Sequence, residues 1–203
     1  MQEQQTFQQL QVEGNPFDGT IYRLCNDWFN HIPYMADRPI KYLEIGAFYG
    51  ANLISVSRNY AAHPMSELHC IDPWCDYAEY KNDSSSDKTG SVYESFRRNL
   101  SVCGQAHRIN VYRGFSHDVI PTLKNDHFDL IYVDGNHEPE YVMEDCVIAF
   151  RKLKVGGYMV IDDYLDSMCE GETKMSIDAF LTGYKNRIKN LGTGVGQLFL
   201  QKT

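Results

Sequence analysis

The sequence predicts an α/β protein in which one doubly wound sheet, mostly parallel with an antiparallel C-terminal strand, is covered by helices. Three observations support this fold class. From residue 40 onward, strand-like and helix-like segments alternate along the chain. The segments 42–45, 130–133 and 158–161 are nearly continuous apolar runs, as in parallel strands covered on both faces. Finally, 203 residues with 43% hydrophobic content suffice for one domain with a full core.

The start of the chain is expected to differ from the rest. Residues 1–16 are rich in Gln and poor in apolar side chains, so we expect a flexible arm there and a single domain over residues 17–203. Residues 19–32 then carry apolar side chains at helical spacing, which predicts the first helix.

Strands are predicted where short apolar runs are rich in β-branched and aromatic residues. The predicted strands are 40–46, 66–72, 108–114, 127–135, 155–164 and 195–202.

Helices are predicted where apolar residues recur at a period near 3.6. After the first, the predicted helices are 51–60, 91–102, 116–124, 139–153 and 174–188. Ser91 with Glu94 three residues later forms a capping-box pattern, and Pro139 suits a first helical turn. The polar segment 73–90 is predicted to be a long loop that acts as a lid or a binding loop.

Charge, hydropathy and cysteine usage narrow the class of protein. The net charge of −8 and the pI of about 5.3 disfavour a nucleic-acid partner, which requires a basic surface. No apolar run approaches the roughly 18 residues of a membrane span, and the start of the chain has no signal-peptide pattern. The six cysteines form no CxxC pair, so we expect reduced thiols in a cytoplasmic protein with no membrane partner. The sequence leaves open whether the chain forms a homo-oligomer and whether it is one domain of a longer polypeptide.

In a doubly wound sheet, ligands bind beyond the carboxyl ends of the strands, so the residues at which strands stop are informative. The first strand ends in LEIGAFYG, which contains Glu44, Gly46 and Gly50. This GxxxG spacing differs from the dinucleotide fingerprint GxGxxG and favours a cofactor without a pyrophosphate. Glu44 would suit a ligand with an ammonium group, whereas close packing of helix on strand is the alternative explanation for the glycines.

The second and third strands also end at polar residues. Asp72 could accept hydrogen bonds from a ribose diol, or could simply end the strand before Pro73. Ser116 and His117 stand at the start of a short helix and could border an adenine, although Ser116 is equally suited to cap that helix.

The fourth and fifth strands end at carboxylates. Asp134 follows the fourth strand, and Asp162 and Asp163 follow the fifth, which we expect to be its neighbour. Three carboxylates at one crevice would repel each other, and a hard divalent cation such as Mg²⁺ or Mn²⁺ would remove that cost. The alternative is that one aspartate caps the turn and the others are solvated. His137, three residues after Asp134, is either a general base or a solvated loop histidine.

Five of these motifs occur in the order found in a known family. LEIGAFYG, CIDPW, RGFSHDVIPTLK, FDLIYVDGNH and KVGGYMVIDDY resemble the motifs of Rossmann-like class I S-adenosylmethionine methyltransferases, over roughly residues 38–165. They are most similar to the metal-dependent small-molecule O-methyltransferases, which include catechol O-methyltransferase and the macrocin-type sugar enzymes. Catechol enzymes carry a lysine at the His137 position and usually Asp-Asn at the Asp162–Asp163 position, so the chain is closer to the sugar branch.

The resemblance implies a role for each strand end. Glu44, Gly46 and Gly50 would hold the methionine part of S-adenosylmethionine, Asp72 its ribose, and Ser116 and His117 its adenine. Asp134, Asp162 and Asp163 would bind Mg²⁺ or Mn²⁺, and His137 would be the catalytic base beside Asp134.

The predicted function is therefore S-adenosylmethionine- and divalent-metal-dependent O-methylation of a sugar hydroxyl in a glycan or glycoside. Three alternatives stay open: a catechol or other phenolic small-molecule acceptor, a non-catalytic module that binds S-adenosylmethionine, and a nucleotide-dependent oxidoreductase. The missing GxGxxG pattern disfavours the oxidoreductase.

Overall fold

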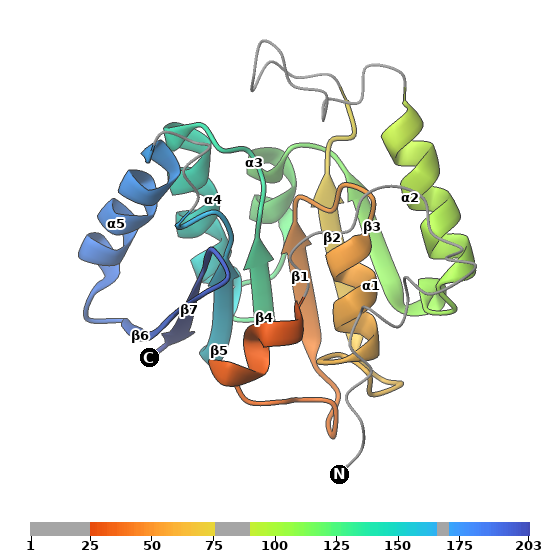
Figure 1. Ribbon diagram of the computed structural model, residues 1–203, viewed down its shortest axis with the longest axis horizontal. Helices are drawn as coiled ribbons and strands as arrows, with labels where there is room; N and C mark the ends of the chain where they lie inside the picture. Colours follow the sequence, from red (N-terminus) through yellow and green to blue (C-terminus); the bar gives the residue numbers. More distant parts are fainter. Residues whose placement is uncertain (1–24, 76–89, 166–170) are drawn as a thin grey trace.

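The computed structural model describes residues 25–75, 90–165 and 171–203, which form a seven-stranded sheet with helices on both faces (Figure 1). The strands are β1 (Lys41–Ile45), β2 (Glu67–Asp72), β3 (Ile109–Arg113), β4 (Phe128–Val133), β5 (Leu153–Ile161), β6 (Ile188–Gly194) and β7 (Gln197–Lys202). The α-helices are α1 (Ala51–Arg58), α2 (Ser91–Val102), α3 (Ser116–Val119), α4 (Pro139–Lys152) and α5 (Glu172–Tyr184). Short 3₁₀ helices are η2 (Cys25–Asn30), η3 (Ala106–Arg108) and η4 (Ile120–Thr122).

The strand order confirms the predicted fold class. The order across the sheet is β3-β2-β1-β4-β5-β7-β6, and β1 to β5 run parallel to one another. β7 pairs antiparallel with β5, and β6 pairs antiparallel with β7. The chain moves outward from β1 to β3 and then returns to β4 on the other side of β1. The carboxyl ends of β1 and β4 are therefore the switch point at which such sheets bind ligands.

Side chains alternate between the two faces of each strand, and each face has its own core. Tyr42 and Tyr132 point to the face covered by η2, α1 and α2, where Trp28 is fully buried. Leu43 and Phe150 belong to the other core, which α4 and α5 cover. Figure 1 shows α1 in front of the sheet and α5 at its β6–β7 side.

The strand register aligns the residues that follow β4 and β5. Val133 pairs with Ile45 on one side and with Ile161 on the other. The backbone continues this pattern, because the N–H of Asp134 donates to the Ile45 carbonyl and the N–H of Asp162 donates to the Val133 carbonyl, both at 2.9 Å. Asp134 and Asp162 consequently lie next to each other, as the sequence predicted.

The structure corrects the predictions for the start of α2, the end of α5 and the number of strands. Gly90 occupies the N-cap of α2 with φ 72°, and Ser91 is the first helical residue, so the capping box does not form. α5 ends at Tyr184, four residues before the predicted end. The strand β6 that follows was not predicted because its sequence, IKNLGTG, is polar and lies mostly exposed at the sheet edge.

Some of the remaining predictions fall outside the described residues, and others can be compared with the structure. The arm 1–16, the first part of the helix 19–32 and residues 76–89 of the long loop lie outside the described residues. Cysteines 25, 70, 103 and 146 are reduced thiols, as predicted. Among the described helices, none has the length and apolar character needed to cross a membrane.

Candidate active site

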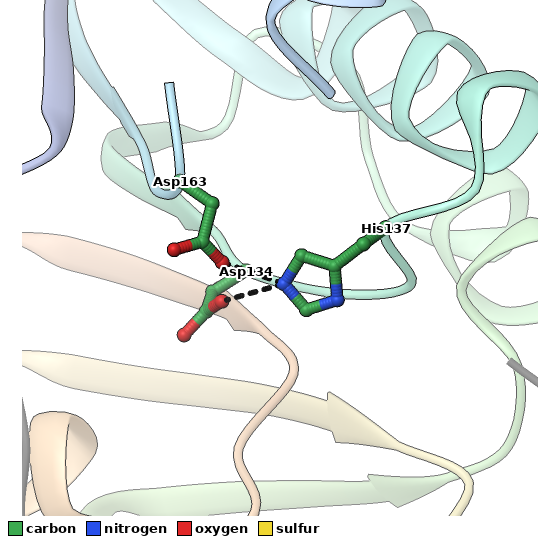
Figure 2. Close-up of side chains that lie close together, drawn as sticks. All are labelled: Asp134, His137 and Asp163. Carbon is green, nitrogen blue, oxygen red and sulfur yellow. Dashed lines mark hydrogen bonds and ion pairs between the residues drawn. The ribbon is translucent and has the colours of Figure 1, made fainter. Parts of the chain in front are cut away.

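Three side chains converge beyond the carboxyl ends of β4 and β5 (Figure 2). Asp134 follows β4, Asp163 lies two residues after β5, and His137 belongs to the loop that leads into α4. Nε2 of His137 lies 2.6 Å from Oδ2 of Asp163 and 3.9 Å from Oδ1 of Asp134. The side chain of His137 is 25% exposed. The cluster is therefore sheltered but open to a ligand.

The charges of this cluster fit a divalent cation. Burial raises the pKa of Asp134 well above its ordinary value, and the nearby charges of Asp162 and Asp163 raise it further. One ligand atom each from Asp134, His137 and Asp163 lies within 4.8 Å of the others. Carboxylate oxygens suit Mg²⁺ or Mn²⁺, and such a cation would offset the repulsion between the acids.

Asp162 departs from the predicted arrangement. Its side chain is 6% exposed, and its Oδ2 accepts a 2.7 Å hydrogen bond from the Tyr132 hydroxyl. Among the described residues, the group with ligand atoms in mutual reach contains Asp163 but not Asp162. The backbone leaves the extended conformation at Asp163, which has φ 55°, and this turn directs Asp163 to the cluster while Asp162 stays in the core.

Three residues with strained backbone lie just after strands at this edge of the sheet. Asp163, Phe48 and Trp74 are non-glycine residues with φ values of 55°, 47° and 40°, which place them in the left-handed region. They follow β5, β1 and β2 respectively. Such strain persists only where surrounding contacts enforce it, and it is concentrated at functional sites.

The two glycines after β1 are required by packing of the chain on itself. Gly46 has φ 83°, and a Cβ atom there would lie 1.7 Å from the Asp134 carbonyl oxygen. Gly50 has φ 82° at the N-cap of α1, and a Cβ atom there would lie 3.0 Å from the Phe96 ring. The contacts of these glycines are therefore those of close packing, the alternative explanation. At Gly46, the absence of a side chain allows the loop after β1 to lie directly against Asp134.

Glu44 is enclosed between the sheet and α1. Its side chain is 1% exposed, and Oε2 accepts hydrogen bonds from the Tyr42 hydroxyl at 2.5 Å and from Nδ2 of Asn52 at 3.0 Å. Burial raises the pKa of Glu44 to about 8, against the lowering effect of these bonds. This enclosure disfavours the predicted direct contact between Glu44 and a ligand's ammonium group.

Asp72 ties two loops together. Its Oδ2 accepts a hydrogen bond from the Phe48 N–H at 2.8 Å, and its Oδ1 accepts one from the Trp74 N–H at 2.7 Å. The Trp74 indole N–H in turn donates to the Phe48 carbonyl at 2.8 Å. Each carboxylate oxygen can accept more than one hydrogen bond, so this fixed carboxylate still fits a ribose diol.

Ser116 and His117 open α3, near the carboxyl end of β3. Phe115 occupies the N-cap, so the alternative that Ser116 caps the helix is wrong. The His117 ring stacks on Phe115 and Tyr141, with centroids 5.4 and 6.3 Å away. Ser116 instead hydrogen-bonds the carboxylate of Asp145, whose pKa burial raises to about 7.

Sequence reasoning missed Tyr132 and Asp145. A signal for Tyr132 was present, because residues two apart in a strand share a face and Asp134 is two residues further on. Tyr42 and Glu44 have the same spacing and the same kind of hydrogen bond. Asp145 lies in the middle of an amphipathic helix, and no local pattern marks it.

Comparison with known proteins gives concordant results. A family model described as "Methyltransferase domain" matches residues 43–164. The chain is 26% identical over 132 residues to an uncharacterized protein of Acanthamoeba polyphaga mimivirus, covering 63% of this chain and 52% of that protein. It is 26% identical over 129 residues to O-methyltransferase hkm8 of Aspergillus hancockii, covering 64% and 44%. The chain thus spans about half the length of the curated relatives it matches.

A solved structure shows the same fold. The O-methyltransferase TomG from Streptomyces achromogenes, involved in tomaymycin synthesis and determined in complex with S-adenosylmethionine, superposes with a TM-score of 0.59 at 21% identity. The superposition covers 80% of this chain and 73% of that one. The resemblance found in the motifs is confirmed at the level of the family, because the family model spans more than half of the sequence. The chain therefore belongs to the methyltransferase domain family.

Proposed function

We propose that the protein is an S-adenosylmethionine-dependent O-methyltransferase that acts on a sugar hydroxyl, in a glycan or glycoside, and uses Mg²⁺ or Mn²⁺. One observation carries the proposal: the 2.6 Å contact between His137 and Asp163, with Asp134 at its side. The similarity to hkm8 and TomG, both O-methyltransferases, supports methyl transfer to oxygen.

S-adenosylmethionine, when bound, supplies a methyl group on a sulfonium that is a good leaving group. The residues that would hold it lie at the ends of β1, β2 and β3. Asp72, fixed by two backbone N–H groups, would accept the ribose hydroxyls. Ser116 and His117 would border the adenine. Gly46 and Gly50 shape the loop beside the methionine part.

A divalent cation, when bound, supplies Lewis-acid stabilisation of negative charge on the acceptor oxygen. Asp134 and Asp163 would hold it, and Asp162 adds negative charge beside Asp134. The His137 ring lies beside both carboxylates, and its imidazole would accept the proton of the acceptor hydroxyl. Asp163 would then stabilise the protonated ring, as a carboxylate does for a catalytic histidine elsewhere.

The pairing of His137 with Asp163 favours a sugar hydroxyl over a phenol as the acceptor. A phenol has a pKa near 10, as the tyrosine side chain shows, whereas a sugar hydroxyl is a much weaker acid. A weaker acid gains more from a positioned base, and such a base typically contributes roughly 10²–10⁴-fold.

The test is release of S-adenosylhomocysteine from S-adenosylmethionine with two acceptor panels, deoxysugar glycosides and catechols, each with Mg²⁺ and with EDTA. Release on the glycosides that EDTA abolishes is the expected result. Release on catechols alone would assign a phenolic acceptor. Release that persists in EDTA would contradict the cation. Binding of S-adenosylmethionine without release on any acceptor would favour a non-catalytic binding module.

A further inference from the structure

A buried hydrogen-bond network lies directly behind the acid cluster. The Tyr132 hydroxyl, in β4, lies 2.7 Å from Oδ2 of Asp162 and 3.1 Å from Oδ2 of Asp134. On the other side, Nε2 of Gln197 lies 3.5 Å from the same hydroxyl oxygen. Oε1 of Gln197 accepts a 2.7 Å hydrogen bond from the Trp28 indole. The network thus connects η2 and β7 with the two aspartates.

Packing alone does not explain why the side chains of this network carry polar groups. Trp28, Tyr132 and Gln197 are at most 2% exposed. Replacing both partners of a buried hydrogen bond by apolar groups of the same shape is often nearly neutral. Tyr60 belongs to the same core and contacts the Trp28 ring at 5.6 Å, yet its hydroxyl has no hydrogen-bond partner among the described residues. A tyrosine hydroxyl is therefore tolerated in this core without a partner, whereas that of Tyr132 contacts two carboxylates.

The hydroxyl of Tyr132 carries a single hydrogen and cannot donate fully to both aspartates at once. Its shorter contact is with Asp162, and Asp134 shares the same oxygen at a longer distance. Nε2 of Gln197 donates to this oxygen at 3.5 Å, which leaves the hydroxyl hydrogen for the acids. Two carboxylates that repel each other are thereby held in one orientation.

We propose that Tyr132 is a positioning residue of the divalent-cation site. It holds the Asp162 side chain in the core and the Asp134 side chain toward the cluster, so that Asp134 faces His137 and Asp163. Gln197 acts through Tyr132. This inference rests on the proposed function, since it concerns the same cation, and it extends the site to Gln197 of β7.

The test is calorimetric titration of the purified protein with Mg²⁺ alone. Partners behind metal ligands typically contribute 10–100-fold to metal affinity. We therefore expect Tyr132→Phe to weaken Mg²⁺ binding by about 10–100-fold. Tyr60→Phe, which removes a hydroxyl from the same core, is the matched control and should bind Mg²⁺ like the wild type. The affinity of Tyr132→Phe for S-adenosylmethionine should not change, because the residues assigned to the ribose and adenine follow β2 and β3, whereas Tyr132 lies in β4.

A second variant separates positioning from general damage to the fold. Gln197→Met removes the amide contact with Tyr132 and should also weaken Mg²⁺ binding. Because Gln197 acts through Tyr132, adding Gln197→Met to Tyr132→Phe should cause little further loss, whereas independent structural effects would multiply. If Tyr132→Phe does not fold, a Gln197→Met variant with wild-type Mg²⁺ affinity would still overturn the proposal.

The outcomes distinguish this inference from the proposed function. If the wild type binds Mg²⁺ and Tyr132→Phe binds it equally well, the positioning role alone is overturned. Wild-type protein that does not bind Mg²⁺ would contradict the cation in the proposed function and, with it, this inference.

Discussion

Nε2 of His137 lies 2.6 Å from Oδ2 of Asp163, although 26 residues separate them in the sequence. The parallel pairing of β4 with β5 brings them together, because each lies just beyond the end of its strand. Asp134 provides a second carboxylate 3.9 Å from the same nitrogen. The contact with Asp163 fixes the orientation of the His137 ring beside Asp134.

Replacing His137 by Ala should lower the turnover number by about 10²–10⁴-fold, because a positioned base is lost. The dissociation constant of S-adenosylmethionine should stay unchanged, since the ring contacts Asp163 in the acid cluster. Initial rates at saturating substrate and calorimetry with the cofactor measure the two quantities. His107→Ala, at an exposed histidine of η3, is the control. Full turnover of His137→Ala, with chemistry rate-limiting, would exclude this base.

Two glycine variants test whether the β1 loop must lie against Asp134. Gly156 and Gly46 have φ values of 82° and 83°, but a Cβ atom meets nothing within 4 Å at Gly156 and lies 1.7 Å from the Asp134 carbonyl at Gly46. Gly156→Ala should therefore lower the free energy of unfolding by only about 1–2 kcal/mol, the cost of the left-handed backbone.

Gly46→Ala should destabilise the protein much more than Gly156→Ala, because the main chain at Asp134 has to move. It should also weaken Mg²⁺ binding, which Gly156→Ala should leave intact. Urea unfolding of both variants and calorimetry with Mg²⁺ provide the comparison. Equal losses of stability in the two variants would show that the close approach at Gly46 is not required.

The enclosed Glu44 predicts a pH dependence of stability. Its pKa is about 8 in the folded protein, against 4.5 for an ordinary glutamate, so the folded state retains a proton that the unfolded state releases. Stability is then fully present below about pH 4.5 and decreases as the pH rises toward 8. One proton corresponds to a slope of up to about 1.4 kcal/mol per pH unit.

Glu44→Gln cannot titrate and should remove this part of the slope. Glu67→Gln is the control, because the pKa of the exposed Glu67 is lowered and it titrates below this range. Urea unfolding of the three proteins at several pH values between about 5 and 8 measures the difference. A Glu44→Gln variant with the wild-type slope would show that Glu44 is already ionised throughout this range.

The sequence was sufficient to predict the parts of the site that depend on strand order. Asp134 and Asp163 could be assigned to one crevice because each follows an apolar run that reads as a buried parallel strand. His137 could be added because the loop after Asp134 is short. These inferences required only the ends of strands and the rule that parallel strands end at the same edge.

Side-chain direction was harder to predict. Asp162 and Asp163 are adjacent, and only the backbone at Asp163, with φ 55°, decides which of them faces the cluster. Glu44 is a charged residue at a strand end, and its burial depends on partners from α1 that the local sequence does not indicate. β6 was missed for a different reason, because an exposed edge strand lacks an apolar pattern.

The most direct test of the central claim is the binding of Mn²⁺, followed by electron paramagnetic resonance of the free ion. Asp163→Asn removes one charge of the cluster, and Asn tolerates the left-handed backbone at this position. Asp37→Asn, at an exposed loop residue before β1, is the control. We predict that the wild type and Asp37→Asn remove the signal of free Mn²⁺, whereas Asp163→Asn binds at least about 10-fold more weakly. Equal binding by all three proteins, or no binding by the wild type, would contradict a cation site at Asp134, His137 and Asp163.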